Sequence, residues 1–271
     1  MEFREKAEEL FNKADYDGLL ELVKEEIEEN PKEALEYCNK VIERKPNDKE
    51  AYFIKFDYLV NDSEIKTWEG GEEQLKEEIL STFHRLIKLE EDTSEVFEYY
   101  SDLIDFYEGR LQDIEAAAKI YKEANELADK FPNVEAALDI RFGYFSYLTI
   151  SCKFNENDGS KEKLKEEVLK VFYKMIELES DKEEICEEYD SLGDFYIEKM
   201  NDYEAAIGVY EEALGKYKFK EDDQEWLQDK LETAKERARS KNKVNIVINP
   251  FVLSTIVIIA IIFAICCKFI K

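Results

Sequence analysis

The chain has 271 residues, of which 65 are acidic and 38 basic, and its formal net charge is −27. All the acidic residues and 34 of the basic ones lie in residues 1–240, so that segment carries a net charge of −31. Such an acidic body is repelled by nucleic acid and offers no basic stripe to bind it, so we expect no nucleic-acid partner. Few prolines and glycines, against abundant Glu, Lys, Leu and Ala, favour helices throughout.

Helical periodicity runs through this acidic body. Leu75, Ile79, Phe83 and Leu86 recur at intervals of three and four residues, the stripe of an amphipathic helix. Polar breaks such as Asn30-Pro31 carry the signals that start a helix. We expect irregular segments at residues 61–71 and 154–160, and helices at 2–13, 16–29, 31–45, 48–61, 72–90, 94–109, 113–130, 134–152, 161–179, 183–199, 203–217 and 222–241.

The body also contains an internal duplication with a period of 89 residues. Residues 72–125 align with residues 161–214 without a gap, and 25 of the 54 aligned positions are identical. A repeat of this kind cannot bury its apolar face alone and must stack on neighbours, which predicts a solenoid. We therefore expect a degenerate N-terminal repeat at 1–45, a first copy at 46–134, a second copy at 135–221, and a capping helix with a basic stalk at 222–245.

An uncharged run of 22 residues, Ile246–Cys267, follows the acidic body. A helix of that length covers about 30 Å, the hydrocarbon thickness of a bilayer. Residues 1–20 hold no apolar run of the kind that a secretory signal needs. The pattern predicts a tail-anchored membrane protein with one span at 246–267, a short tail at 268–271 and a body that faces the cytosol.

Basic residues flank the uncharged run and form a predicted membrane collar. Four lie before it and two after it, an excess that favours a cytosolic body and suits anionic headgroups. The collar consists of Arg237, Arg239, Lys241, Lys243, Lys268 and Lys271.

The sequence holds no constellation of residues typical of catalysis or cofactor binding. His84 is the single histidine, and no phosphate-binding glycine loop or Cys-x-x-Cys pair is present. The scattered cysteines Cys38, Cys152 and Cys186 are typical of reduced core residues. The adjacent pair Cys266-Cys267 is open to packing in lipid or to acylation. We expect no enzyme activity, no cofactor, no metal and no small-molecule substrate.

The segment Leu192–Leu214 carries small and aromatic residues in nearly the order of the tetratricopeptide repeat, with one extra residue in the turn between its two helices. The chain resembles that family over most of residues 31–220. The resemblance implies a right-handed solenoid of helical hairpins, with small residues where helices cross. The positions that it assigns to repeat packing are Ala34, Pro46, Tyr107, Ala117, Tyr121, Ala124, Gly193, Tyr196, Ala206, Tyr210 and Ala213.

Members of that family hold a peptide in a concave groove lined by the first helix of each pair. By resemblance, the positions that face the groove are Ser101, Asp105, Glu108, Asp190, Asp194 and Ile197. Asp105 and Asp194 stand where chaperone-binding members of the family carry an amide, which disfavours chaperone tails as ligands. Carboxylates in the groove favour a cationic partner through charge complementarity, although these acids also fit the alternative of generic solubilising charge.

These patterns together predict a membrane-tethered, non-catalytic adaptor that presents a groove to the cytosol for a basic peptide or helix. Two alternatives remain open at this level. One is a targeting or fission receptor for cationic segments on an organelle surface. The other is an architectural subunit whose helices dock flatly on a partner in the same membrane.

Overall fold

The computed structural model describes residues 2–155 and 159–241. The predicted span at 246–267, its tail and the collar residues Lys243, Lys268 and Lys271 lie outside the described residues. The described chain contains eleven α-helices and a twelfth helical segment at residues 221–241, together with short 3₁₀ and π-helical turns. The all-α class predicted from the sequence is confirmed for this part of the chain. No helix within the described ranges is both long and apolar enough to cross a bilayer.

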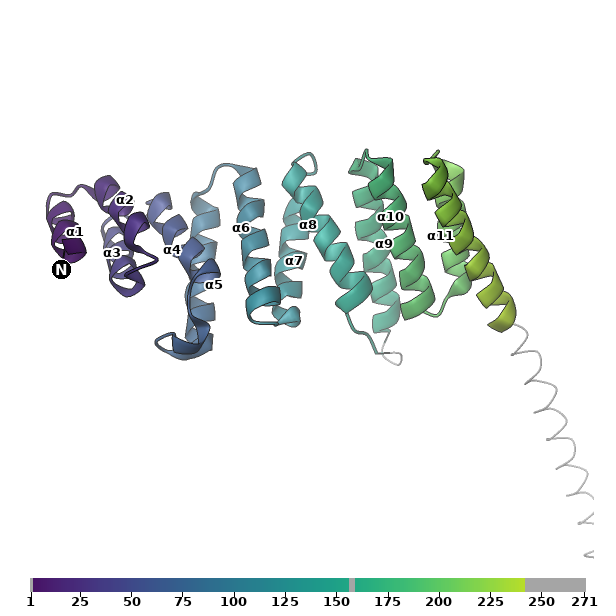
Figure 1. Ribbon diagram of the computed structural model, residues 1–271, viewed down its shortest axis with the longest axis horizontal. Helices are drawn as coiled ribbons and strands as arrows, with labels where there is room; N and C mark the ends of the chain where they lie inside the picture. The colour runs from purple at the N-terminus through teal and green to yellow at the C-terminus, as the bar shows by residue number, and fades with distance from the viewer. Residues whose placement is uncertain (1, 156–158, 242–271) are drawn as a thin grey trace, which may run out of the picture. The chain divides into compact units, whose positions relative to one another are not determined.

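Two compact units divide the chain, Met1–Tyr144 and Phe145–Lys271. The first unit holds α1 to α7 and most of α8 (Figure 1). Their bounds are α1 Glu2–Asn12, α2 Tyr16–Glu26, α3 Pro31–Arg44, α4 Lys49–Asn61, α5 Gly71–Leu89, α6 Thr93–Asp105, α7 Ile114–Ala128 and α8 Glu135–Ser146. A 3₁₀ turn η1 (Ile65–Thr67) precedes α5, and a π-helical turn η2 (Phe106–Arg110) continues α6.

The second unit begins in the last turn of α8. Its described elements are the π-helical turn η3 (Tyr147–Ser151), α9 (Ser160–Leu178), α10 (Lys182–Asp194), the π-helical turn η4 (Phe195–Lys199), α11 (Tyr203–Lys216) and the helix at residues 221–241, which we call the final helix. Every helix expected from the sequence therefore has a counterpart.

Helices that follow one another in the sequence pack against one another within each unit. In the first unit each helix from α1 to α7 contacts the next, and α4 also contacts α2 and α6. In the second unit α10 contacts both α9 and α11. Sequential antiparallel pairs of this kind are typical of helical-repeat proteins.

Aspartate side chains cap the start of six of the twelve helices of the described chain. Each accepts a hydrogen bond from a backbone N–H of the first turn and so satisfies a group that lacks a partner within the helix. The capping residues are Asp15, Asp48, Asp92, Asp113, Asp181 and Asp202. The polar breaks in the sequence thus mark helix starts for a physical reason.

The 89-residue period of the sequence is also a period of the local structure. α5, α6 and η2 correspond to α9, α10 and η4 residue for residue at that offset. Gly70 and Gly159, which precede the long helices, both adopt positive φ angles, of 100° and 77°. This backbone conformation favours glycine because it has no Cβ. The duplicated segments therefore fold alike.

The extra residue in the turn between paired helices is absorbed by a π-helical turn. The backbone N–H of Leu111 donates to the Phe106 carbonyl, and that of Met200 to the Phe195 carbonyl, each at 3.1 Å. This i→i+5 bonding accommodates one residue more than an α-helical turn. A basic residue at the end of each turn then reaches back to the preceding helix pair. Arg110 donates to the carbonyls of Val60 and Ser63, and Lys199 to those of Leu148, Thr149 and Ile150.

The repeat-packing positions are mostly buried. Ala34, Ala117, Ala124, Ala206, Ala213 and Tyr210 have no exposed surface, and Tyr107 and Tyr196 are also buried. Tyr121 is half-buried, and Pro46 is exposed. The Pro46 carbonyl accepts from the Arg85 side chain. Gly193 lies under the Tyr210 ring, because a Cβ built on Gly193 would come within 2.2 Å of the ring carbon Cζ.

Candidate functional site

An uncompensated acidic surface lies on α6 and η2 in the first unit. Asp105 is exposed, and no hydrogen bond or ion pair joins it to another described residue. Glu108 accepts a long hydrogen bond of 3.5 Å from Tyr121, and Ser101 donates to the Phe97 carbonyl within its own helix. Burial, with the negative charges of Asp57 and Asp105, raises the pKa of Asp102 to about 6. Asp102, Asp105 and Glu108 therefore lie here without an ion pair to another described residue.

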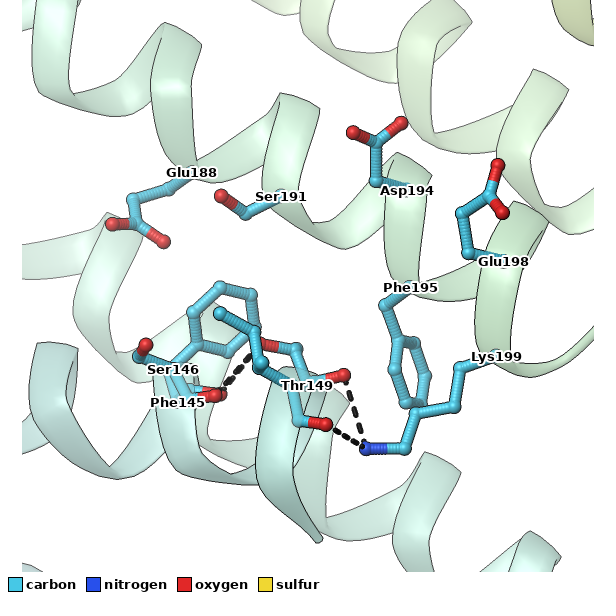
Figure 2. A pocket seen from close by; sticks show the side chains of 10 residues that line it. Phe145, Ser146, Thr149, Glu188, Ser191, Asp194, Phe195, Glu198 and Lys199 are labelled. Carbon is cyan, nitrogen blue, oxygen red and sulfur yellow. Dashed lines mark hydrogen bonds between the residues drawn. The ribbon is translucent and has the colours of Figure 1, made fainter. Parts of the chain in front are cut away.

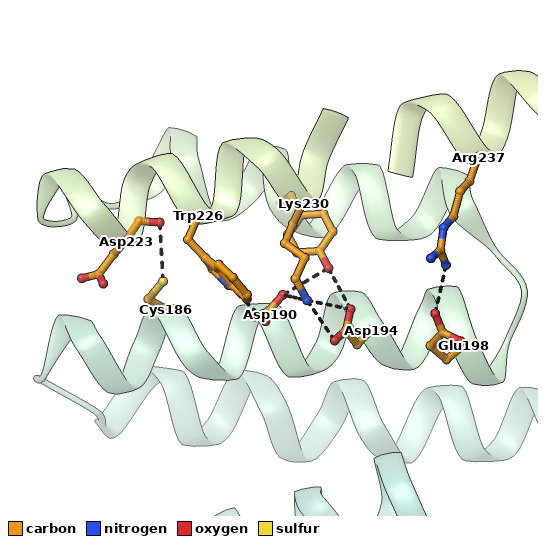
Figure 3. Close-up of polar contacts among 9 residues, drawn as sticks. Cys186, Asp190, Asp194, Glu198, Asp223, Trp226, Lys230 and Arg237 are labelled. Atoms are coloured by element: carbon orange, nitrogen blue, oxygen red, sulfur yellow. Dashed lines mark hydrogen bonds and ion pairs between the residues drawn. The ribbon is translucent and has the colours of Figure 1, made fainter. Parts of the chain in front are cut away.

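The corresponding face of α10 in the second unit is covered by the final helix. Lys230 binds Asp190 at 2.9 Å and both carboxylate oxygens of Asp194 at 3.1 and 3.0 Å. Tyr210 donates to the same two aspartates, and the Trp226 indole N–H donates to Asp190 (Figure 3). Burial lowers the pKa of Lys230, but its bonds to the two aspartates outweigh that effect and raise it.

The final helix is held in this place by an apolar stripe as well as by charge. Its buried residues are Leu227, Leu231, Ala234 and Ala238, which recur at intervals of three and four. The helix is thus an integral cap of the second unit. Ile197, expected in a groove, is also buried, with 6% of its surface exposed. Of the three groove positions expected on α10 and η4, Asp190 and Asp194 bind the cap and Ile197 joins the core.

Part of the predicted membrane collar also binds within the second unit. Arg237 pairs with Glu198 at 2.9 Å (Figure 3), and Lys241 donates to the Asn201 carbonyl and lies over the Tyr203 ring. Arg239 is exposed. These contacts fasten the end of the final helix to the turn between α10 and α11.

A hollow of about 530 Å³ lies between α10 and η3. Glu188, Ser191, Asp194 and Glu198 follow one another along α10 and η4 on one side of it (Figure 2). The other side and the floor are formed by Phe145, Ser146, Thr149, Ile150, Phe195 and Lys199. The volume falls within the range of sites that hold a ligand or an inserted side chain.

Glu188 differs from the other carboxylates of the hollow. Asp194 and Glu198 have cationic partners on the final helix, whereas no hydrogen bond or ion pair joins Glu188 to another described residue. Burial, with the charges of Glu184 and Glu187, raises the pKa of Glu188 to about 7. Lys199 forms no ion pair with it, and its ammonium group donates instead to three backbone carbonyls.

The described residues offer no group of His, Cys, Asp and Glu side chains placed to hold a metal ion. His84 packs edge-on against Phe83. The arrangement on α10 and η4 presents acidic groups beside an apolar wall, which is chemistry suited to recognising a cation that carries an apolar stem.

No family model, curated protein or solved structure matches this chain.

Proposed function

We propose that the chain is a tail-anchored adaptor of the tetratricopeptide type that binds a basic peptide or helix. The span would be Ile246–Cys267, and the described helices would form the body that the anchor holds at the membrane surface. The proposal assigns no catalytic activity and no cofactor to the chain.

The observation that carries the proposal is the pairing of an acidic row with an apolar wall beside α10 and η4. Acidic side chains at Glu188, Asp194 and Glu198 lie across the hollow from Phe145 and Ile150. Ile150 is 76% exposed, an unusual degree for a large apolar side chain at the rim of a hollow. Apolar contact supplies affinity in such a site, and complementary charge supplies association rate and selectivity.

The final helix supports the same chemistry, because it binds two of the acids that line the hollow. It places Trp226, Lys230 and Arg237 against Asp190, Asp194 and Glu198. Acidic residues of α10 and η4 therefore already bind cationic side chains of one helix within the chain. A second cationic segment, supplied by a partner, fits Glu188, the acid of the hollow that the final helix leaves unpaired.

Peptide binding by the full-length chain in a non-ionic detergent tests this function. A fluorescent peptide of Arg, Leu and Ala should bind, and its affinity should fall as salt screens the attraction. The same peptide with Glu in place of Arg is the matched control and should not bind. Equal binding of the two peptides, or no binding of either, would refute the proposal.

A further inference from the structure

The hollow beside α10 contains one carboxylate, that of Glu188, which forms no ion pair or side-chain hydrogen bond with another described residue. Cations of the final helix hold Asp194 and Glu198, and the Lys199 ammonium is engaged by carbonyls of the residues from Leu148 to Ile150. Glu188 is left at one end of the hollow, with Glu184 and Glu187 on its own helix adding like charge. A half-buried carboxylate without a partner is less stable as an anion than one in water, and an added cation relieves that cost.

The walls of the hollow fit the stem of a long side chain rather than a free ion. Phe145, Phe195 and Ile150 provide apolar surface, and the Thr149 hydroxyl is turned away to the Phe145 carbonyl at 2.9 Å. Lysine and arginine bury their methylene stems along such surfaces and keep the charged head at a polar group. A single carboxylate is also a poor metal site, since hard cations take several oxygen ligands.

We propose that this hollow receives one arginine or lysine side chain of the partner, with its head group on the Glu188 carboxylate and its stem against Phe195 and Ile150. The assignment rests on the proposed function and narrows it to one residue of the partner and one pocket. It also separates Glu188, which binds the partner, from Asp190 and Asp194, which bind the cap.

Binding in this way couples to the protonation of Glu188. The groups that face it from α8 and η3 are Phe145, Ser146, Thr149 and Ile150, none of which carries a charge. The remaining charged groups of the hollow are paired or bonded as described above. Since the pKa of Glu188 is about 7, the carboxyl group is mostly neutral in mild acid and mostly charged in mild base. Affinity for the cationic side chain should therefore rise with pH across neutrality.

The test uses short acetylated Leu-X-Leu peptides in which X is arginine, lysine or citrulline, the neutral analogue of arginine. Binding to the full-length chain in non-ionic detergent is measured for the wild type, Glu188→Gln and Glu187→Gln. Glu187 is the matched control because it is exposed and lies outside the hollow on the same helix. A charge-assisted hydrogen bond predicts that Glu188→Gln lowers affinity for the arginine and lysine peptides about 10-fold or more.

Glu188→Gln should leave the weak binding of the citrulline peptide unchanged and remove the rise of affinity with pH. Glu187→Gln should preserve the preference for a cation and the rise of affinity with pH, with the rise moved slightly to lower pH because the charge of Glu187 helps to raise the pKa of Glu188. The inference is overturned if both variants weaken binding alike, or if citrulline and arginine peptides respond equally to Glu188→Gln. Those outcomes, with longer Arg-containing peptides still bound, would leave the adaptor function standing. Loss of all binding by basic peptides would instead refute the adaptor function itself.

Discussion

Replacing Gly193 by alanine should destabilise the second unit through a specific clash with Tyr210. A Cβ at this position would lie 2.2 Å from Cζ, 2.3 Å from the hydroxyl oxygen and 2.6 Å from Cε1 of that ring. Tyr210 has no exposed surface and donates to Asp190 and Asp194, so it cannot yield without breaking these contacts. Overpacking of this kind costs about 1–3 kcal/mol.

The first copy of the repeat indicates what such a shift involves. Ile104 stands at the position equivalent to Gly193, and Tyr121 at the position of Tyr210. Tyr121 is only half-buried and lies over Gly143, where a Cβ would come within 2.8 Å of its ring. With Ile104 in place of a glycine, the ring of Tyr121 thus packs over Gly143 instead and is less buried than the ring of Tyr210.

Gly208→Ala is the matched control for this prediction. Gly208 lies in α11 with nothing within 4 Å of an added Cβ, so alanine there gains about 1 kcal/mol of helix propensity. The same gain in helix propensity applies at Gly193. The difference in the free energy of unfolding between the two variants therefore measures the clash alone. Thermal unfolding followed by circular dichroism should place Gly193→Ala about 1–3 kcal/mol, or roughly 2–12 °C, below Gly208→Ala. Equal stability of the two variants would refute the close packing of the repeat.

Three further predictions concern charge and the membrane. Lys230→Met leaves two half-buried aspartates without their cation and should cost about 1–3 kcal/mol in urea unfolding, whereas Met at the exposed Lys218 should have little effect. Glu188→Gln should leave stability unchanged in acid but stabilise the chain above neutral pH, on the order of 2 kcal/mol. The reason is that a carboxyl group with a raised pKa contributes stability below about pH 4.5 and loses it as pH rises through about 7. Glu187→Gln should lack this pH dependence, and identical unfolding curves for the two variants would contradict the account. Deletion of Pro250–Lys271 should move the chain from the alkali-resistant membrane fraction to the supernatant; a full-length chain already in the supernatant would disprove the anchor.

Helix positions could be predicted from the sequence because they depend on local signals. Apolar residues at intervals of three and four give the buried stripe, and aspartates such as Asp92 and Asp181 cap the first turn. The π-helical turns could not be located in this way. The extra residue between Tyr196 and Ala206 signals an insertion. Whether i→i+5 bonding absorbs it is a matter of tertiary contacts, such as the hydrogen bonds from Lys199 to the carbonyls of η3.

The candidate site could be predicted only in part, since tertiary contacts decide which acids are free. Lys230 pairs with both Asp190 and Asp194. These residues are about forty positions apart in the sequence, so no local sequence pattern predicts the contact. Replacing these two aspartates would therefore disturb the cap as well as any partner. Glu188 was missed because sequence alone does not distinguish it from its acidic neighbours. The sequence holds one signal for the paired acids. Trp226, Lys230 and Arg237 recur along the predicted capping helix at spacings that place them on one face, where they can meet acids of a neighbouring helix.

Photo-crosslinking of a basic peptide to the full-length chain tests the central claim most directly. The peptide carries a photo-reactive leucine beside its arginine, and the crosslinked residues are identified by mass spectrometry. The account predicts crosslinks to Ile150 and to the stretch from Glu188 to Glu198, and their loss with Glu188→Gln but not with Glu187→Gln. Crosslinks confined to α9 and α11, or unchanged by Glu188→Gln, would contradict it.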